Sequence, residues 1–422
     1  MLLNIIFSFV ALVFLLGLVA YMLVLLANNS RILSISQEKV DLEGELLKAK
    51  IKSIMDRRKI EAKQLNLSWN GFRKFKVTSK EKETSDITSF YLAPHDGKEL
   101  PEFLPGQFLT FQIPVPTQPH PVIRCYSLSD SPFYPDRYRV SIKRVPAPRD
   151  NSSAPPGLIS TYFHDSLNEN DIVDVKAPSG HFCMSMTKKY PVVLLAGGVG
   201  ITPLLSMLNA IAEMGSQREV WFFLGVRNKK EHAMKEHLEM VARENENVHL
   251  KVFYSAPAET DVLNEDYHVK GRVNVENIKT FLPSSNFDFY ICAPPPMVKD
   301  LRKDLAEWGV PKKNIHFEAF GPATVKGCKA KPEKESGVKI NIQFEKSGKT
   351  LVWDSKAASL LDFAELNGIP IDSGCRAGNC GTCLTAVRKG KVELVGEPGS
   401  KPEEGSCLAC ISIPKEDLTL DA

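Results

Sequence analysis

The chain has 422 residues, which gives room for roughly two to four domains that each bury a hydrophobic core. Its 53 basic and 50 acidic side chains nearly cancel, so the overall charge gives no reason to expect a nucleic-acid partner. Nine cysteines in a chain of this length, without the framework of a small stapled domain, argue against a disulfide scaffold.

Residues 1–28 are predicted to form a transmembrane anchor. No charged side chain occurs from Met1 to Leu26, and a helix needs about 20 apolar residues to cross a hydrocarbon core. A secretory signal is the alternative, but the segment lacks a basic start and a small-residue cleavage site. Basic residues gather after the apolar run, so the positive-inside rule predicts a single pass through the plasma membrane with the catalytic domains in the cytoplasm.

Residues 29–69 are predicted to form a helical stalk. The sequence between Ser34 and Lys63 is charged and free of proline, and apolar residues recur at helical spacing. They are Val40, Leu47, Ile51 and Ile54. A solvated spacer, a coiled-coil seam and a basic face on anionic lipid are the three alternatives. Only about two heptads are apolar, which favours the spacer.

Residues 70–186 are predicted to form an antiparallel barrel, because short strands alternate with turn residues. The expected strands are 75–77, 87–92, 107–113, 138–144 and 172–176. Within the barrel, Arg124, Tyr126 and Ser127 place a phosphate anchor, a flat stacking ring and a hydroxyl along one strand. Such a strand suits one extended ligand with an anionic end and a flat end.

Three segments resemble the flavin-binding elements of the ferredoxin-NADP reductase superfamily, and in particular the reductase portion of flavohaemoglobins. The segments are Pro105–Phe108, Arg124–Ser127 and Gly157–Ser160. The resemblance implies that Arg124, Gly157 and Ser160 hold the flavin phosphates. It also implies that Tyr126 packs on the isoalloxazine ring and that Ser127 forms a hydrogen bond near its reactive nitrogen. FAD is expected, with FMN as the alternative because phthalate dioxygenase reductases share the module order and use FMN.

Residues 187–322 are predicted to bind a nicotinamide nucleotide. A strand over 191–196 runs into glycines and then into a helix over 204–214, which forms a phosphate cradle from bare backbone and a helix N-terminus. The loop is similar to the G-G-x-G-x-T-P of the same superfamily. This implies nucleotide contacts from Gly197, Gly198, Gly200, Thr202 and Pro203. Later strands alternate with helices, which predicts a parallel sheet covered on both faces.

Two further segments of this region resemble the superfamily. Ile291–Met297 is similar to C-G-P-P-x-M, whose cysteine lies beside the nicotinamide, although Ala293 replaces the glycine. A buried structural role is the alternative for Cys292. The segment ending in Glu318 and Phe320 is similar to the flavohaemoglobin terminus, where the glutamate approaches the nicotinamide and the aromatic ring covers the flavin. Ser127, Cys292 and Glu318 are therefore the candidate catalytic residues.

The choice between NADH and NADPH stays open at this stage. The second strand of the nucleotide module ends at Gly225–Asn228 without an acidic residue to bind a free ribose hydroxyl. Arg227 suits a 2'-phosphate or is a solvated loop charge. The likeness to flavohaemoglobins favours NADH.

A linker at 323–336, without apolar periodicity, leads to a predicted ferredoxin domain at 337–422. Cys375, Cys380 and Cys383 have the spacing C-x4-C-x2-C, which together with a distant fourth cysteine is the plant-type [2Fe-2S] ligand pattern. Zinc loops usually contain two C-x2-C pairs, whereas the first gap here is four residues. Glycines at 374, 378 and 381 allow positive φ and bring backbone N–H groups near the sulfurs.

Two cysteines compete for the fourth ligand position. The region resembles ferredoxin modules fused to oxygenase reductases, whose last ligand sits in a Leu-x-Cys step entering a strand. Leu408–Ile413 fits that pattern, which makes Cys410 the ligand and Cys407 a buried neighbour. The strands and single helix predicted around the cysteines look like the β-grasp ferredoxin fold.

These modules predict a membrane-anchored NAD(P)H-dependent reductase. Electrons pass from NADH to FAD to [2Fe-2S] and on to a protein acceptor such as an oxygenase, a desaturase or another membrane redox partner, because a flavin converts a two-electron hydride into single-electron steps. One alternative is a quinone reductase of the sodium-pumping type, although the component of that enzyme with the same modules places its ferredoxin first. The others are a redox-sensing module with the cluster outside turnover and a flavin oxidoreductase for small oxidants.

Overall fold

The computed structural model describes residues 2–116, 121–147, 153, 155–319, 340–355, 357–376, 378, 381–395, 398 and 402–422. The chain divides into two compact units, Met1–Asn66 and Leu67–Ala422.

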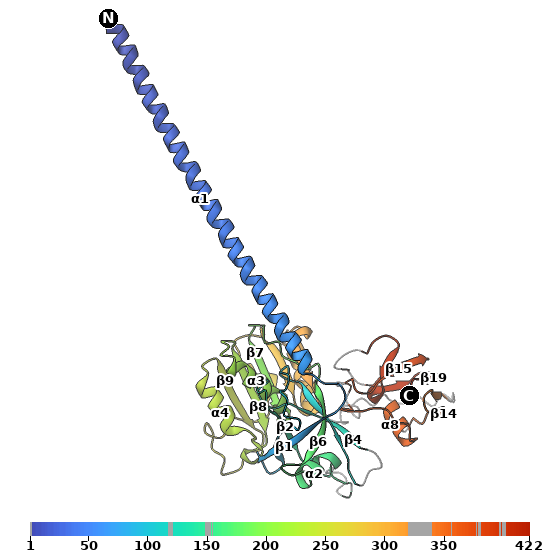
Figure 1. Ribbon diagram of the computed structural model, residues 1–422. Helices are drawn as coiled ribbons and strands as arrows, with labels where there is room; N and C mark the ends of the chain where they lie inside the picture. Colours follow the sequence, from blue (N-terminus) through green and yellow to red (C-terminus); the bar gives the residue numbers. More distant parts are fainter. Residues whose placement is uncertain are drawn as a thin grey trace. The chain divides into compact units, whose positions relative to one another are not determined.

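The first unit consists of one long helix, α1 (Leu2–Leu67), drawn in blue in Figure 1. At 1.5 Å per residue a helix of this length spans about 100 Å. Within it, Leu12–Arg31 is long and apolar enough to cross a membrane, and its side chains are exposed. The predicted anchor and the predicted stalk are thus parts of one continuous helix.

The second unit begins with six antiparallel strands and a short helix. They are β1 (Arg73–Lys82), β2 (Ile87–Pro94), β3 (Phe108–Ile113), β4 (Val122–Ser127), β5 (Tyr138–Lys143), β6 (Ile172–Ser179) and α2 (Leu158–Asp165). Their order in the sheet is β4-β3-β6-β1-β2-β5. A bridge between Leu128 and Val140 joins the two ends of this order. The sheet therefore closes into the predicted barrel, which removes its exposed edges.

The barrel interior is filled by aromatic rings from strands that are distant in sequence. Phe163 of α2 packs edge-on against Phe90 at 5.2 Å and against Phe111 at 5.3 Å between ring centroids. All three rings are fully buried. Helix α2 is thereby held against the face of the barrel that carries β4.

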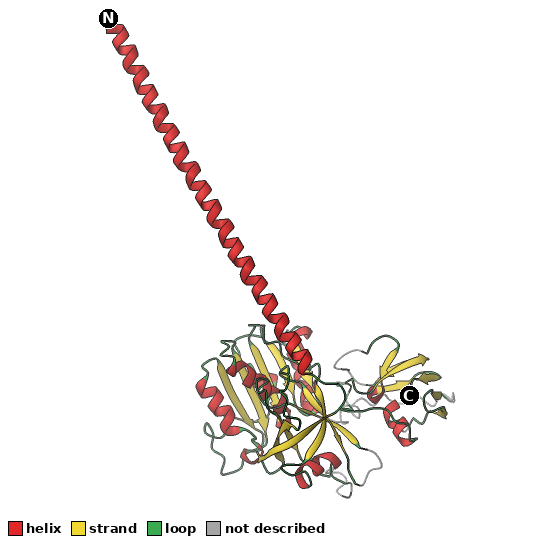
Figure 2. Ribbon diagram, viewed as in Figure 1, coloured by secondary structure: helices red, strands yellow, loops and turns green. Residues whose placement is uncertain are grey.

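A parallel sheet of six strands follows, with order β10-β9-β8-β7-β11-β12. Figure 2 draws the strands in yellow and the helices in red. The strands are β7 (Val192–Gly197), β8 (Val220–Val226), β9 (Val248–Tyr254), β10 (Val269–Lys270), β11 (Asp288–Cys292) and β12 (Ile315–Glu318). The helices are α3 (Ile201–Glu213), α4 (Lys235–Glu244), α5 (Val275–Ile278) and α6 (Pro295–Glu307).

Both faces of this sheet are buried, as its near-continuous apolar strands predict. Along β7, Val192 and Leu194 share a core with α3 and α4, whereas Val193 and Leu195 share a separate core with α5 and α6. The strand order reverses beside β7, because β8 lies on one side of it and β11 on the other. In open parallel sheets this switch point is where ligands bind.

The C-terminal region forms a mixed sheet around one helix. Its elements are β13 (Asn341–Phe344), β14 (Lys349–Val352), α8 (Leu360–Leu366), β15 (Leu384–Lys389), β16 (Val392–Leu394), β17 (Ser406–Leu408), β18 (Ser412–Pro414) and β19 (Leu418–Leu420). Five strands follow the order β14-β13-β19-β15-β17, with β13 and β19 parallel. Helix α8 begins at Ser359, whose hydroxyl accepts from the Asp362 N–H, and the chain turns at Gly368 with φ +65°.

One predicted element of this region is wrong. The strand expected over Leu408–Ile413 is interrupted by a short 3-10 helix, Ala409–Ile411, between β17 and β18. The turn points Cys410 toward the cysteine loop, so that its sulfur lies 3.1 Å from that of Cys383. Apart from this break, the predicted fold class is confirmed: a barrel, a parallel α/β domain and a ferredoxin-like domain, with one N-terminal helix as a candidate membrane span.

Candidate functional site

Strand β4 carries the three side chains that the sequence assigned to a flavin. The Tyr126 ring meets Phe163 at 5.3 Å between centroids, and burial raises the pKa of the Tyr126 hydroxyl. Ser127 is 5% exposed, and its Oγ has no hydrogen-bond partner among the described residues. A buried hydroxyl without a partner is unfavourable unless a ligand supplies one. The end of β4 therefore fits the polar edge of a bound ring.

The predicted phosphate contacts lie on β4 and at the start of α2. Arg124 is half-buried, which lowers the pKa of its guanidinium, and its Nη1 donates to the Ile123 carbonyl at 2.7 Å. Ser160 Oγ donates to the Gly157 carbonyl at 2.9 Å and accepts from the Val145 N–H at 3.1 Å. The Ser160 hydroxyl thus stabilises the turn that precedes α2. Its predicted contact with a flavin phosphate stays a prediction.

The glycine loop fits a phosphate cradle. It forms a short 3-10 helix, Gly198–Gly200, between β7 and α3. A Cβ on Gly200 would lie 2.0 Å from the Cys292 carbonyl oxygen, so only glycine allows this close packing. Gly198 has φ +54° and open space around the position of a Cβ. Its backbone is therefore accessible at the N-terminal end of α3, where an anion is favoured.

The other predicted residues of this loop help to build its shape. Thr202 is buried, and its Oγ1 donates to the Val199 carbonyl at 3.1 Å. Pro203 is buried in the first turn of α3, where a missing N–H costs little. Gly197 ends β7, and a Cβ there would lie 2.8 Å from the Ala293 methyl group. The alanine that departs from the superfamily pattern therefore fits because Gly197 has no side chain.

The structure brings two of the candidate catalytic residues together. Cys292 ends β11 and Glu318 ends β12, and the two residues are paired in register. Cys292 is completely buried, and both burial and the Glu318 charge raise the pKa of its thiol well above normal. A cleft lined by Cys183, His316 and Glu318, among others, opens beside them. Phe320, the ring predicted to cover the flavin, lies outside the described residues.

The cysteine loop brings sulfurs together as the spacing predicts. Cys383 Sγ and Cys410 Sγ are 3.1 Å apart, and the thiol of Cys375 is close enough to raise the pKa of Cys410 further. The Gly378 N–H donates to the sulfur of Cys410. Gly378 and Gly381 have φ of +75° and +70°, which confirms the expected positive φ at two of the three predicted glycines. Cys380 lies outside the described residues.

Cys407 differs from Cys410 in its surroundings. It lies on β17, paired in register with Thr385, and burial raises the pKa of its thiol to about 12. Ser412 supplies a hydrogen bond to this thiol. The charge of Cys383 also raises the pKa of Cys407, so Cys407 lies near that sulfur as well. The sulfur of Cys410 contacts that of Cys383 directly, at 3.1 Å, and the choice of Cys410 as the fourth ligand stays a prediction.

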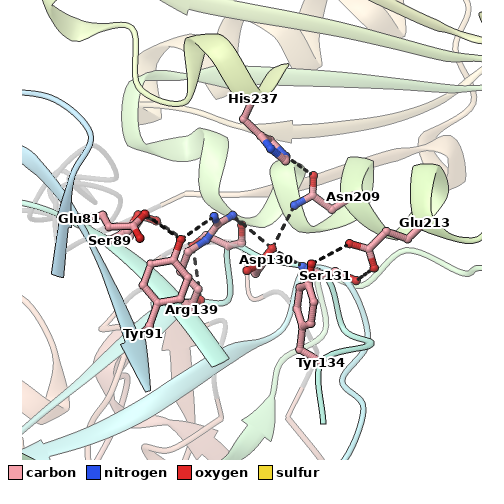
Figure 3. Close-up of polar contacts among 12 residues, drawn as sticks. Glu81, Ser89, Tyr91, Asp130, Ser131, Tyr134, Arg139, Asn209, Glu213 and His237 are labelled. Carbon is pink, nitrogen blue, oxygen red and sulfur yellow. Dashed lines mark hydrogen bonds and ion pairs between the residues drawn. The ribbon is translucent and has the colours of Figure 1, made fainter. Parts of the chain in front are cut away.

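Sequence reasoning missed a polar network that joins the barrel to the nucleotide module (Figure 3). Its members come from β5, the loop after β4, α3 and α4. They are Asp130, Ser131, Tyr134, Arg139, Asn209, Glu213 and His237. No local spacing predicted it, because the partners lie far apart in the chain. The one available signal was a cluster of polar residues directly after the flavin strand.

Comparison with known proteins identifies all three modules. Residues 74–184 match the model of the oxidoreductase FAD-binding domain, and residues 194–303 match that of the oxidoreductase NAD-binding domain. Residues 342–415 match the 2Fe-2S iron-sulfur cluster binding domain. The FAD/NAD-binding domain of a nitric oxide dioxygenase from Vibrio cholerae is 31% identical, with a TM-score of 0.53, and the chain covers all of it with 60% of its own length. The chain belongs to the ferredoxin-NADP reductase superfamily.

Relatives within this superfamily support both parts of the resemblance. A flavohaemoprotein of Halalkalibacterium halodurans is 40% identical over 263 residues, which are 62% of this chain and 63% of that protein. The chain thus spans less than two thirds of that relative. A phthalate dioxygenase reductase is 26% identical with a TM-score of 0.55, over 83% of this chain and 98% of that one.

These findings confirm the predicted cofactors and enzyme class. The chain is an NAD(P)H-dependent oxidoreductase of the ferredoxin reductase type, with binding domains for FAD, a nicotinamide nucleotide and a [2Fe-2S] cluster. The module order, flavin then nicotinamide then ferredoxin, is also as predicted. It differs from the order that the sodium-pump alternative requires.

Proposed function

We propose that this reductase is anchored in a membrane and passes electrons from NADH through FAD and the [2Fe-2S] cluster to a separate protein. The observation that carries the proposal is that the three binding domains occur together in one chain. The likeness to phthalate dioxygenase reductase, described as transferring electrons from pyridine nucleotides to [2Fe-2S], supports it over nearly all of that protein. A protein acceptor suits a cluster that releases one electron at a time.

Specific side chains support the first transfer. FAD, when bound, accepts two electrons as a hydride and releases them singly. Ser127 would donate its unused hydrogen bond to the reactive edge of the ring, and Tyr126 would stack on its face. Cys292 and Glu318 would border the nicotinamide ring at the ends of adjacent strands. The glycine loop before α3 would hold the nucleotide phosphates.

The membrane anchor is supported by α1. Its segment Leu12–Arg31 is apolar and exposed, and basic residues follow it along the same helix. By the positive-inside rule this arrangement favours a cytoplasmic location for the reductase modules. An anchored reductase diffuses in the same membrane as its membrane-bound partners and meets them often. This favours an acceptor in that membrane.

The charges after β8 support NADH as the donor. Arg227 forms an ion pair with Glu231. Lys229 Nζ lies 2.8 Å from Asp266, whose pKa the lysine lowers to about 2. In a nucleotide-binding sheet this strand end faces the adenosine ribose. A 2'-phosphate would meet cations that are already neutralised, so NADPH gains little there.

Glu231→Gln is expected to improve the use of NADPH. Without the carboxylate, the Arg227 guanidinium becomes available to a 2'-phosphate, which should raise kcat/KM for NADPH relative to NADH about tenfold. The matched control is Glu239→Gln, which removes a similar carboxylate from the Lys235 pair on α4. Flavin reduction with each nucleotide measures the ratio. An unchanged ratio in Glu231→Gln would place the 2'-position away from Arg227.

An anaerobic titration tests the proposed electron path as a whole. The full chain, purified in detergent, is titrated with NADH while visible absorption and low-temperature EPR are recorded. The flavin should bleach, and the signal of a reduced [2Fe-2S] cluster should follow within turnover time. A cluster that stays oxidised beside a bleached flavin would show that the cluster lies outside the path.

A further inference from the structure

A buried chain of polar groups connects the flavin barrel to the nucleotide module. Asn209 on α3 donates from Nδ2 to Asp130 Oδ1 at 3.3 Å, and Asp130 follows the flavin strand by three residues. On its other side, Asn209 Oδ1 accepts from His237 Nε2 of α4 at 2.8 Å. Figure 3 shows the asparagine between these two partners. A single amide thus links the loop of one module to two helices of the other.

The direction of each bond in this chain is fixed by chemistry. An ionised carboxylate only accepts hydrogen bonds, so Asp130 accepts from the NH2 group of Asn209. The amide oxygen of Asn209 then accepts from His237. His237 must therefore carry a proton on Nε2. Asn209 is only 4% exposed, so water cannot easily replace the hydrogen-bond partner of its amide nitrogen or of its amide oxygen.

Arg139 completes this network of polar groups on the barrel side. It is 8% exposed, its Nη2 lies 3.5 Å from Asp130 Oδ1, and the same nitrogen donates to the Ser129 carbonyl. Its Nη1 also reaches the Tyr91 hydroxyl at 3.5 Å. The charge of Asp130 is thus balanced within the barrel, and Asp130 presents a fixed oxygen to Asn209.

A second contact between the modules lies further along α3, and only one side of it is exposed. Ser131 Oγ donates to Glu213, and the Tyr134 hydroxyl donates to the same carboxylate at 3.4 Å. Glu213 is an exposed residue at the end of α3. Ser131 is only 1% exposed, but water can reach the Glu213 carboxylate and replace its partners there. This contact provides an internal control for the buried one.

The buried chain lies between the two elements that hold the reacting groups. Asp130 continues from β4, whose Ser127 borders the flavin, and Asn209 lies two turns along the helix that begins at the glycine loop. Hydride transfer requires the reacting atoms to approach to about 3–3.5 Å, and a misplacement of about 1 Å can cost about 100-fold in rate. The nucleotide and the flavin are bound by different modules, so their distance depends on how those modules are joined.

We propose that Asn209 is a positioning residue for hydride transfer, which fixes the nucleotide module against the flavin barrel through Asp130 and His237. The inference rests on the proposed use of both modules in the first transfer. It predicts a loss in the rate of the transfer itself rather than in nucleotide affinity, because the nucleotide cradle is left intact.

A charge swap between Asn209 and Asp130 tests the inference. Asn209→Asp alone places two carboxylates against each other and should slow the limiting rate of flavin reduction about 100-fold, with the KM for NADH changed less than about threefold. Adding Asp130→Asn restores a donor and an acceptor across the contact, since an amide at 130 donates to a carboxylate at 209 that still accepts from His237. The double variant should recover part of the rate, because Asp130→Asn also removes the negative charge that faces Arg139. Glu213→Gln should leave it unchanged.

Hydrogen exchange of the same holoenzymes gives a second readout. Amides of 128–134 and 201–213 should exchange faster in Asn209→Asp and return to normal in the double variant. Asn209→Ser removes the contacts without adding charge and replaces the single variant if that does not fold. A folded, flavin-loaded single variant with a normal rate would overturn the inference. If NADH fails to reduce the flavin of the wild-type protein, that result would instead contradict the proposed function.

Discussion

Replacing Cys410 with serine is expected to remove the [2Fe-2S] cluster while NADH still reduces the flavin. The sulfur of Cys410 lies 3.1 Å from that of Cys383 and receives the Gly378 N–H, so it is placed to share a cluster with the cysteine loop. Its loss leaves the cluster with three thiolates. Iron and sulfide content, together with the EPR signal after reduction, measures the loss. Electron delivery to a protein acceptor should fall with it to the background level.

Cys407→Ser is the matched control for this experiment. Cys407 is equally buried and only three residues away, but its thiol is hydrogen-bonded with Ser412 within the sheet. The variant should keep the cluster and lose about 1–2 kcal/mol of folding stability, from the change in a buried polar contact. A cluster that survives Cys410→Ser and disappears in Cys407→Ser would reverse the assignment of the fourth ligand.

Ser127→Ala is expected to slow flavin reduction by NADH about 100-fold, which is typical for removal of one well-placed hydrogen-bond donor at a reacting group. The reason is that Ser127 Oγ is buried and has no partner among the described residues, so a bound flavin is its natural acceptor. The protein itself should not become less stable in its cofactor-free form, because Ser127 Oγ makes no hydrogen bond within the part of the chain that the structure describes. Stopped-flow absorption at saturating NADH measures the rate.

Ser129→Ala provides the comparison, two residues further along the chain. Ser129 is also fully buried, but its Oγ shares a hydrogen bond of 2.8 Å with Ser141. This variant should lose about 1 kcal/mol of stability and keep its rate of flavin reduction within about twofold. Equal slowing in both variants would indicate that disturbance of the barrel, rather than a flavin contact, controls the rate.

The features that the sequence predicted correctly depend on residues that are close together in the chain. The cysteine loop, with its positive φ at Gly378 and Gly381, forms within nine residues. The glycine loop leads directly from β7 into α3. Short strands separated by turn residues were enough to predict the barrel, and strands that alternate with helices were enough to predict the parallel sheet. The resemblance to known reductases suggested roles for Ser127 and Cys292, which spacing alone does not give and which stay predictions.

What the sequence by itself determined is therefore the set of modules and their order, because each depends on short-range patterns, and the resemblance carried by those patterns supplied the cofactors. The tertiary structure decided which partners those residues meet. The turn at Ala409–Ile411 brings the sulfur of Cys410 to 3.1 Å from that of Cys383, Glu231 neutralises Arg227, and Asn209 meets Asp130 across the two modules. These contacts depend on strand register and on how separate elements pack, and no local pattern in the chain records them.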